Sequence, residues 1–131
     1  MSSISVRYIV DDVDAAIGFY CGQLGFTEVM HPAPAFAMLA KDELRLLLSA
    51  PRTEGGGGQS LADGSTPQPG GWNRFTLQVD DLEAEIARLT DAGVTLRSQL
   101  IEGIGGRQVL VADPSGNLVE LFQPTRDEAR L

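Results

Sequence analysis

The stretch VDDVDAAIGFYCGQLGF, residues 10–26, decides the fold because the chain repeats its pattern 69 positions later. Residues 79–94 read VDDLEAEIARLTDAGV, in which the same valine and aspartate pair precedes apolar residues at helical spacing and a closing glycine. Self-similarity at a fixed offset is typical of two copies of one supersecondary unit. The sequence therefore predicts two modules that share one structure.

Each copy begins as a strand and continues as a helix. Residues 5–10 and 74–79 alternate apolar and polar side chains, and this period of two predicts half-buried strands. Asp12 and Asp81 stand where the helices start, and carboxylates there are helix N-caps rather than catalysts, because they accept hydrogen bonds from backbone amides that lack a partner. The helices should end near their closing glycines.

Three more strands are predicted after each helix. In the first copy they cover residues 27–30, 35–40 and 44–50, and in the second residues 95–100, 106–112 and 118–123. Each copy is therefore βαβββ, and the fold class is α+β. GIGGRQ, residues 103–108, is interpreted as a hairpin turn, because a phosphate-binding loop needs a helix after it and a strand follows here.

We expect one domain over residues 1–131, built from four parts. These are module one at residues 4–51, a Gly/Pro/Ser-rich linker or mobile flap at 52–71, module two at 72–124 and a C-terminal tail at 125–131. A chain of 131 residues can bury a sufficient core without disulfides. The lone cysteine, Cys21, falls on a helix pattern and is interpreted as a small buried hydrophobe, not as a nucleophile.

Composition argues against several classes of partner. A formal net charge of −8 repels polyanions, so nucleic acid is not an expected partner. No apolar run approaches the roughly 20 residues that span a bilayer, so a membrane is not expected either. The N-terminal stretch MSSISVRYIV has no basic region followed by a long apolar one, which predicts no secretory signal and a cytoplasmic location.

Two βαβββ copies, with the opening stretch in the first and VADPSGNLVELFQP (residues 111–124) closing the second, resemble the vicinal oxygen chelate superfamily. This superfamily groups glyoxalase I, bleomycin-resistance proteins and extradiol dioxygenases. The resemblance covers residues 4–124. It implies a U-shaped, incompletely closed eight-stranded barrel with a cavity inside the U, usually in a homodimer.

The resemblance also implies where a metal would be held. Metalloenzymes of the superfamily take ligands from the first and last strand of each module, and the matching positions here are Ser5, Leu47, Arg74 and Glu120. Only Glu120 is a usual metal ligand, and an arginine is a fixed cation with no lone pair to offer. We therefore expect no metal and no other cofactor.

Glu120 then needs another partner, and Arg74 is expected to replace the metal as its counter-ion. Such a pair is either a structural salt bridge or part of a ligand site, and the two roles are compatible. Glu120 is also the only candidate for a catalytic residue. His31, the only histidine, precedes a proline in a predicted connection, where a surface or turn role is expected rather than metal ligation.

Period two predicts which side chains face the cavity, while their neighbours in sequence pack under the helices. The predicted ligand-binding residues are Ser5, Arg7, Arg45, Leu47, Ser49, Trp72, Arg74, Thr76, Gln78, Glu120 and Phe122. Arg7 and Arg45 either bind an anionic or carbonyl-bearing group or cover apolar wall with their stems. Trp72 either stacks on an aromatic ligand or anchors the linker.

The leading hypothesis is a metal-free protein, similar to the bleomycin-resistance branch, that binds a small organic molecule. Bleomycin itself is not predicted, because such drugs are cationic and arginines occupy the cavity positions. The enzymatic alternatives are a metal-dependent lyase or isomerase like glyoxalase I, or a ring-cleaving dioxygenase. A metal-free enzyme with Glu120 as general base is a third possibility, and it requires that burial raise the pKa of Glu120.

Overall fold

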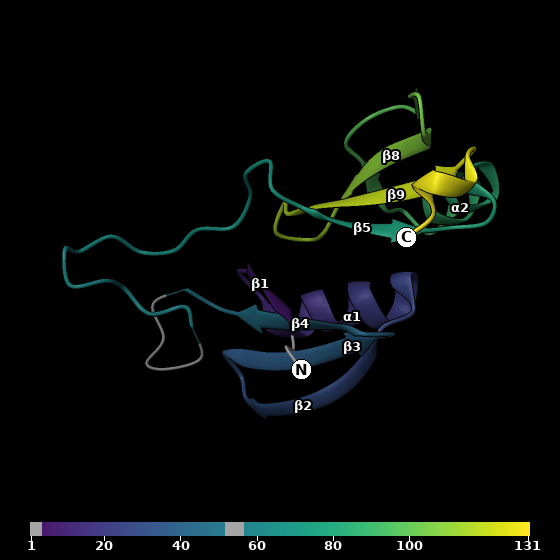
Figure 1. Ribbon diagram of the computed structural model, residues 1–131. Coiled ribbons are helices and arrows are strands. Elements are labelled where there is room, and N and C mark those ends of the chain that lie inside the picture. Colours follow the sequence, from purple (N-terminus) through teal and green to yellow (C-terminus); the bar gives the residue numbers. More distant parts are fainter. Residues whose placement is uncertain (1–3, 52–56) are drawn as a thin grey trace. The chain divides into compact units, whose positions relative to one another are not determined.

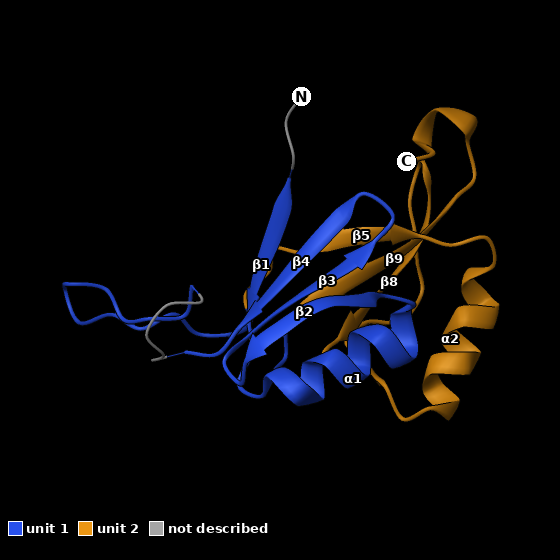
Figure 2. Cartoon of the chain, turned by 90° about the horizontal axis from the view of Figure 1, so that it is seen from below, with its two compact units in different colours: residues 1–70, 114–117 blue, residues 71–113, 118–131 orange. Residues whose placement is uncertain are grey.

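The computed structural model describes residues 4–51 and 57–131, whose contacts separate into two units (Figure 2). The first unit is Met1–Gly70 with Pro114–Asn117, and the second is Gly71–Asp113 with Leu118–Leu131. Module one falls in the first unit, and module two falls in the second apart from the turn at residues 114–117. Residues 52–56 of the predicted linker lie outside the described residues, and residues 57–71 contain no helix or strand.

Module one is a four-stranded sheet with one helix, as Figure 1 shows. Its elements are β1 (Ser5–Ile9), α1 (Val13–Leu24), β2 (Thr27–Ala33), β3 (Phe36–Lys41) and β4 (Leu44–Ser49). The strand order is β1-β4-β3-β2, with β1 parallel to β4 and the other pairs antiparallel. The predicted strands are confirmed, and β2 extends three residues beyond its predicted end at residue 30.

The start and end of α1 follow the sequence signals. The Asp12 carboxylate accepts a hydrogen bond from the Ala15 amide, and Gly25 ends the helix with a φ of 78°, a left-handed conformation that suits glycine. The helix packs on the sheet through Tyr20, which is fully buried and contacts Phe19 and Phe26 edge to face. Of the sheet residues predicted to pack beneath it, Tyr8, Leu46 and Leu48 are buried and Val6 is half-buried; Ala37 and Leu39 on β3 are buried as well.

Module two repeats this plan around a second sheet. Its elements are β5 (Phe75–Gln78), α2 (Leu82–Asp91), β6 (Thr95–Leu96), β7 (Ile101–Glu102), β8 (Gly106–Ala112) and β9 (Leu118–Pro124), followed by a 3-10 turn, η1 (Asp127–Ala129). The strand order is β5-β9-β8-β6, with β5 parallel to β9 and with β7 also paired to β8. The α+β class is confirmed.

The second helix is capped in the same way as the first. The Asp81 carboxylate accepts a hydrogen bond from the Ala84 amide, and Gly93 follows the helix with a φ of 81°. Leu82 and Leu89 are fully buried on α2. On the sheet, Val109, Val111, Val119 and Leu121 alternate with Glu120 and its neighbours and are buried, and Leu110 and Leu118 on the Glu120 side are buried as well. No helix among the described residues is long and apolar enough to cross a membrane.

One predicted strand, residues 95–100, begins at Thr95 as predicted but is four residues too long. The strand ends at Leu96 because the amides of Arg97 and Ser98 both donate to the Leu110 carbonyl, at 2.7 and 3.3 Å. The Ser98 hydroxyl then accepts from the Leu110 amide at 3.0 Å, in the place of a backbone carbonyl. A separate strand, β7, forms a hairpin with β8 whose turn is closed by Gly103 N–H donating to Gly106 O, which confirms the interpretation of GIGGRQ.

Candidate functional site

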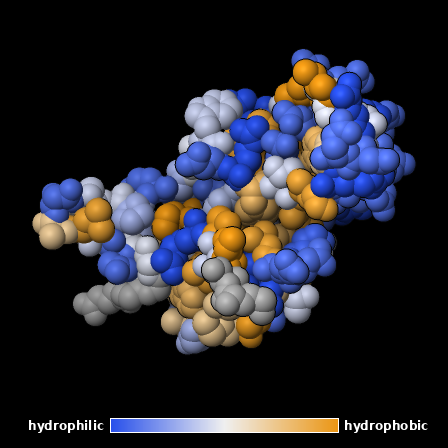
Figure 3. All heavy atoms as spheres, viewed as in Figure 1, coloured by the Kyte–Doolittle hydropathy of each residue, from blue (hydrophilic) through white to orange (hydrophobic). Residues whose placement is uncertain are grey.

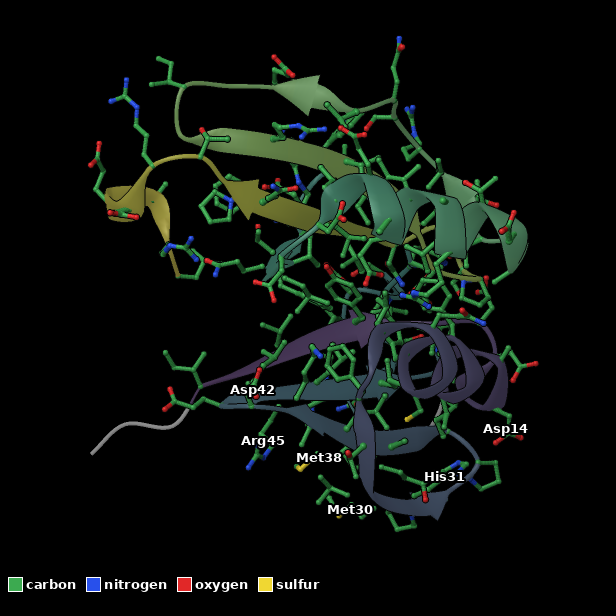
Figure 4. The ribbon with its side chains drawn as sticks, turned by 90° about the vertical axis from the view of Figure 1, so that its right-hand side faces the viewer. Asp14, Met30, His31, Met38, Asp42 and Arg45 are labelled. Carbon is green, nitrogen blue, oxygen red and sulfur yellow. The ribbon has the colours of Figure 1, made fainter. Side chains whose placement is uncertain are left out.

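The helix-free face of module one is the sheet face opposite α1. One row of paired residues crosses all four strands on this face, from Arg7 through Leu47 and Met38 to Met30. The adjacent rows add Ser5, Ile9, Phe36, Ala40, Arg45 and Ser49. Figure 4 shows Arg45, Met38 and Met30 close together on the side of the sheet away from α1. The predicted residues of module one therefore share a face, although Ser49 is fully buried within it.

Met30, Met38 and Phe36 belong to this face and were missed. The alternation of side chains along β3 was the available signal for Met38 and Phe36. Because β3 pairs with β4 in regular register, these residues face the same side as their partners on β4. Met30 carries no such signal, since the register of β2 shifts on both sides of it. Methionines are flexible and polarizable, so a face built on them adapts to ligands of different shapes.

Arg7 and Arg45 have no carboxylate partner within the part of the chain that the structure describes. Arg45 Nη1 instead donates to the carbonyls of Asp42 and Leu44 in the β3–β4 turn, at 3.0 and 3.2 Å. The Arg7 guanidinium lies so close to Gly57 that a Cβ atom there would collide with it. Among the described residues, both guanidinium groups thus lie against backbone and not beside an opposite charge.

The helix-free face of module two centres on Glu120. Its register partners are Thr76 on β5 and Leu110 on β8. Arg74 donates twice to one oxygen, Glu120 Oε1, through Nε at 3.1 Å and Nη2 at 3.0 Å. The side chains are 28% and 13% exposed, so the pair is largely withdrawn from water. The predicted counter-ion of Glu120 is confirmed.

The residues at the four superfamily metal positions do not fit a metal. At Glu120 the space next to the carboxylate is taken by a guanidinium, which is a cation and offers no lone pair. Ser5 and Leu47 supply no carboxylate or imidazole at the module one positions. Among the described residues, no three His, Cys, Asp or Glu side chains come together as a metal site.

Trp72 lies at the start of module two and is attached to it in two ways. Its carbonyl accepts a hydrogen bond from Arg74 Nη1 at 3.3 Å, and Arg97 Cζ lies 5.4 Å from the centre of its ring. The residue is nevertheless 66% exposed, so much of its surface is accessible to another group. Arg97 was missed, because a contact between residues so far apart in sequence leaves no local signal.

Three further predicted residues of module two are on or beside the same face. Thr76 and Phe122 are half-buried, and the Phe122 ring fills the space next to Gly106. Gln78 is engaged by the C-terminal tail, since its Oε1 accepts the Leu131 amide at 2.7 Å. The same tail is held by the Thr125 amide, which donates to the Gly105 carbonyl at 2.9 Å.

His31 and Cys21 lie apart from this chemistry. His31 is in β2 and not in a connection, so the predicted turn position is wrong; β2 is an edge strand, where Pro32 is tolerated. Its Nε2 lies 3.8 Å from Asp14 Oδ1, and Figure 4 shows the two residues close together. Burial, and secondarily the charge of Glu28, raise the pKa of the Cys21 thiol, which disfavours the reactive thiolate.

Comparisons with known proteins agree on one group. A family model described as Glyoxalase/Bleomycin resistance protein/Dioxygenase superfamily matches residues 4–121. A bleomycin resistance protein of Staphylococcus aureus is 28% identical over 123 residues, covering 87% of this chain and 90% of that protein. The crystal structure of a superfamily member from Sphaerobacter thermophilus is 26% identical with a TM-score of 0.74, covering 94% of this chain and 97% of that one. An antibiotic-binding protein from a Streptomyces species is 25% identical with a TM-score of 0.72, covering 95% and 97%.

Proposed function

Because the chain belongs to the glyoxalase/bleomycin resistance protein/dioxygenase superfamily, we propose that it binds a small organic molecule on the helix-free faces of its sheets and requires no metal to do so. The observation that carries this proposal is the Arg74–Glu120 ion pair. Glu120 of this pair stands at the last-strand position from which, by the resemblance, metal-dependent members of the superfamily supply a carboxylate ligand. A carboxylate committed to a guanidinium is a binding or structural group and not one side of a metal centre.

The relatives support binding as the activity. One is named a bleomycin resistance protein and another an antibiotic-binding protein. We do not extend the proposal to bleomycin, because Arg7 and Arg45 place positive charge on the helix-free face of module one. The proposed ligand is a small organic molecule whose apolar part contacts Met38 and Leu47.

The lining of the two faces is consistent with this role. Ligand sites combine mostly apolar walls with a few fixed polar groups that orient the ligand. In module one the apolar part comes from Met30, Met38, Leu47, Phe36 and Ile9. Figure 3 shows hydrophobic residues over much of the surface that the strands of module one form in that view. We propose Trp72 as a further aromatic contact.

We also propose that the protein acts as a homodimer. Strand β2 lies at the edge of its sheet, and Val29 and Met30 on it are 52% and 42% exposed. An exposed edge with apolar side chains is a surface that natural proteins usually cover. Pairing with a second copy would cover it with the closed symmetry that most homo-oligomers have.

Native mass spectrometry of the freshly purified protein is the first test. One spectrum reports the oligomer mass, any bound metal and any organic molecule that co-purifies. We expect a dimer without stoichiometric metal, and we expect Glu120→Gln to have the same metal content as the wild type. A divalent metal present at one per chain in the wild type and lost in Glu120→Gln would overturn the metal-free proposal.

Binding itself is tested with N-phenyl-1-naphthylamine, an uncharged probe that fluoresces in apolar surroundings. Met38→Gln should weaken its binding several-fold, because the substitution puts an amide in the centre of the apolar row. Ile104→Gln is the matched control, since Ile104 is 85% exposed in the β7–β8 turn. Equal binding by wild type and Met38→Gln would exclude this face as the binding surface.

A further inference from the structure

We propose that the ligand is an organic anion, with an apolar body and a carboxylate, sulfonate or phosphate group that Arg7 and Arg45 recognise. This inference rests on the proposed function and adds the chemical class of the ligand. The structural basis is the juxtaposition, on one sheet face, of a methionine-rich apolar row and two guanidinium groups that have no acidic partner among the described residues.

The register places both arginines next to the apolar row. Arg7 is the direct partner of Leu47, and Arg45 lies two residues before Leu47 on the same strand. Because residues two apart in a strand point to the same face, Arg7 and Arg45 flank Leu47 on the helix-free face. Met38 is the partner of Leu47 on the other side. A ligand whose apolar part lies over Met38 and Leu47 therefore has a guanidinium group within reach.

The charges on this face differ from most of those elsewhere in the described chain. Most other described arginines have carboxylates within 4.0 Å, namely Arg74, Arg88, Arg107, Arg126 and Arg130, whereas Arg97 lies over the ring of Trp72. Arg7 and Arg45 have none within the described ranges, although the sequence has eighteen Asp and Glu residues. Two cations without a carboxylate partner in the described part of the chain create a local positive potential on an otherwise acidic protein. An anionic group on the ligand would supply the missing charge.

The β3–β4 turn fixes the orientation of the Arg45 guanidinium before an anion binds. Asp42 adopts a left-handed φ of 51°, and the carbonyls of Asp42 and Leu44 both accept from Arg45 Nη1. These contacts leave Nε and Nη2 without partners among the residues that the structure describes. A planar guanidinium whose orientation is already fixed loses less entropy when it binds an oxyanion.

Two dyes with one ring system test the inference. 1-Anilinonaphthalene-8-sulfonate is N-phenyl-1-naphthylamine with a sulfonate added, so the pair isolates the contribution of the anionic group. We expect Arg7→Gln/Arg45→Gln to weaken binding of the sulfonate dye by about tenfold, since a hydrogen bond between two charged groups is worth that much or more. Binding of the uncharged dye should change by less than about twofold, because no charge-assisted bond is lost.

Arg126→Gln/Arg130→Gln is the matched control, because it removes two exposed arginines of the C-terminal tail and changes the net charge equally. If both double variants weaken the sulfonate dye to the same extent, the effect is one of net charge and the anion inference is wrong. In that case binding of the uncharged dye to Met38→Gln still tests whether this face binds small molecules, which is the proposed function. Circular dichroism and thermal melting of each variant verify that the fold is retained.

Discussion

The two modules share one backbone plan and use it for different chemistry. In each, the first strand is parallel to the last, and the last is antiparallel to the strand before it. Each helix begins at an aspartate N-cap. On the helix-free faces the modules diverge: module two pairs Arg74 with Glu120, whereas module one leaves Arg7 and Arg45 without carboxylates in the described residues.

This difference shows that backbone topology and site chemistry vary independently. The period of two assigns faces in both modules, because it depends only on which side of the sheet the helix covers. The polar groups on the opposite face are not constrained by the core, so they are free to differ. On this face module two pairs Arg74 with Glu120, whereas the arginines of module one are, as we propose, available to a ligand.

Among the glycines of the strands, Gly106 is the position at which the largest loss of stability is expected. A Cβ atom there would collide with the Gln123 carbonyl and the Phe122 ring, so Gly106→Ala forces the β8–β9 pair apart. Module one begins the equivalent strand, β3, with a phenylalanine. We expect Gly106→Ala to lower the free energy of unfolding by about 3 kcal/mol, as overpacking does. Urea denaturation followed by circular dichroism measures it.

Gly22→Ala provides the control for this substitution. Gly22 is in the last turn of α1, and nothing lies within 4 Å of the place that a Cβ atom would take. Alanine is the better helix former, so this variant should gain about 0.5–1 kcal/mol. Should Gly106→Ala prove as stable as the wild type, β8 and β9 do not pack as closely as the structure describes.

The second prediction compares one arginine from each module. Arg74→Met leaves the Glu120 carboxylate, only 13% exposed, without its counter-ion. Leaving a fully buried carboxylate unpaired would lower the free energy of unfolding by about 3–5 kcal/mol. Because Glu120 is partly exposed, we expect Arg74→Met to lower it by about 2 kcal/mol. Arg7→Met removes no ion pair within the described residues and should change stability by less than about 0.5 kcal/mol.

A double variant separates the charge effect from lost packing. Arg74→Met/Glu120→Met replaces both charges with apolar side chains and should recover most of the lost stability, because no unpaired carboxylate remains. If the double variant is as unstable as Arg74→Met alone, the cost comes from packing of the arginine stem. An equal loss for Arg7→Met and Arg74→Met would remove the contrast between the modules.

Sequence reasoning recovered the fold because the fold depends on local signals. Alternation places the strands, aspartates start the helices, and the repeat shows that the pattern occurs twice. It failed for the end of the strand at residues 95–100. There the Ser98 hydroxyl, and not a backbone carbonyl, accepts the hydrogen bond of the Leu110 amide, and β6 ends early. This hydrogen bond depends on which strand is the neighbour of β6, and the strand propensities of residues 95–100 carry no information about that neighbour.

The site could be predicted mainly where the superfamily resemblance marks positions in the sequence. Arg74 and Glu120 were found in this way, because the resemblance places metal ligands on the first and last strands of each module, and in module two these strands are β5 and β9. Met30 depends on irregular register in β2, and the contact between Trp72 and Arg97 depends on tertiary packing. The hydrogen bond between Gln78 and the Leu131 amide likewise follows from the fold of the tail.

The smallest expected loss of stability concerns the aspartate N-caps, which both modules have. Asp12 and Asp81 make the same contact, each accepting a backbone amide three residues later at 3.1 Å. Replacing an N-cap aspartate by alanine typically costs about 1 kcal/mol, so Asp12→Ala and Asp81→Ala should destabilise the protein equally. Asp12→Asn and Asp81→Asn keep an acceptor and should retain most of the stability.

Equal losses have a meaning beyond capping. If the two modules unfold as one cooperative unit, a change in either helix shifts the whole transition by the same amount, and circular dichroism shows one midpoint. If they unfold separately, each alanine variant splits the transition and moves only the part that belongs to its own module. The paired substitutions therefore show whether the repeated plan also makes one thermodynamic unit, which the shared topology alone does not establish.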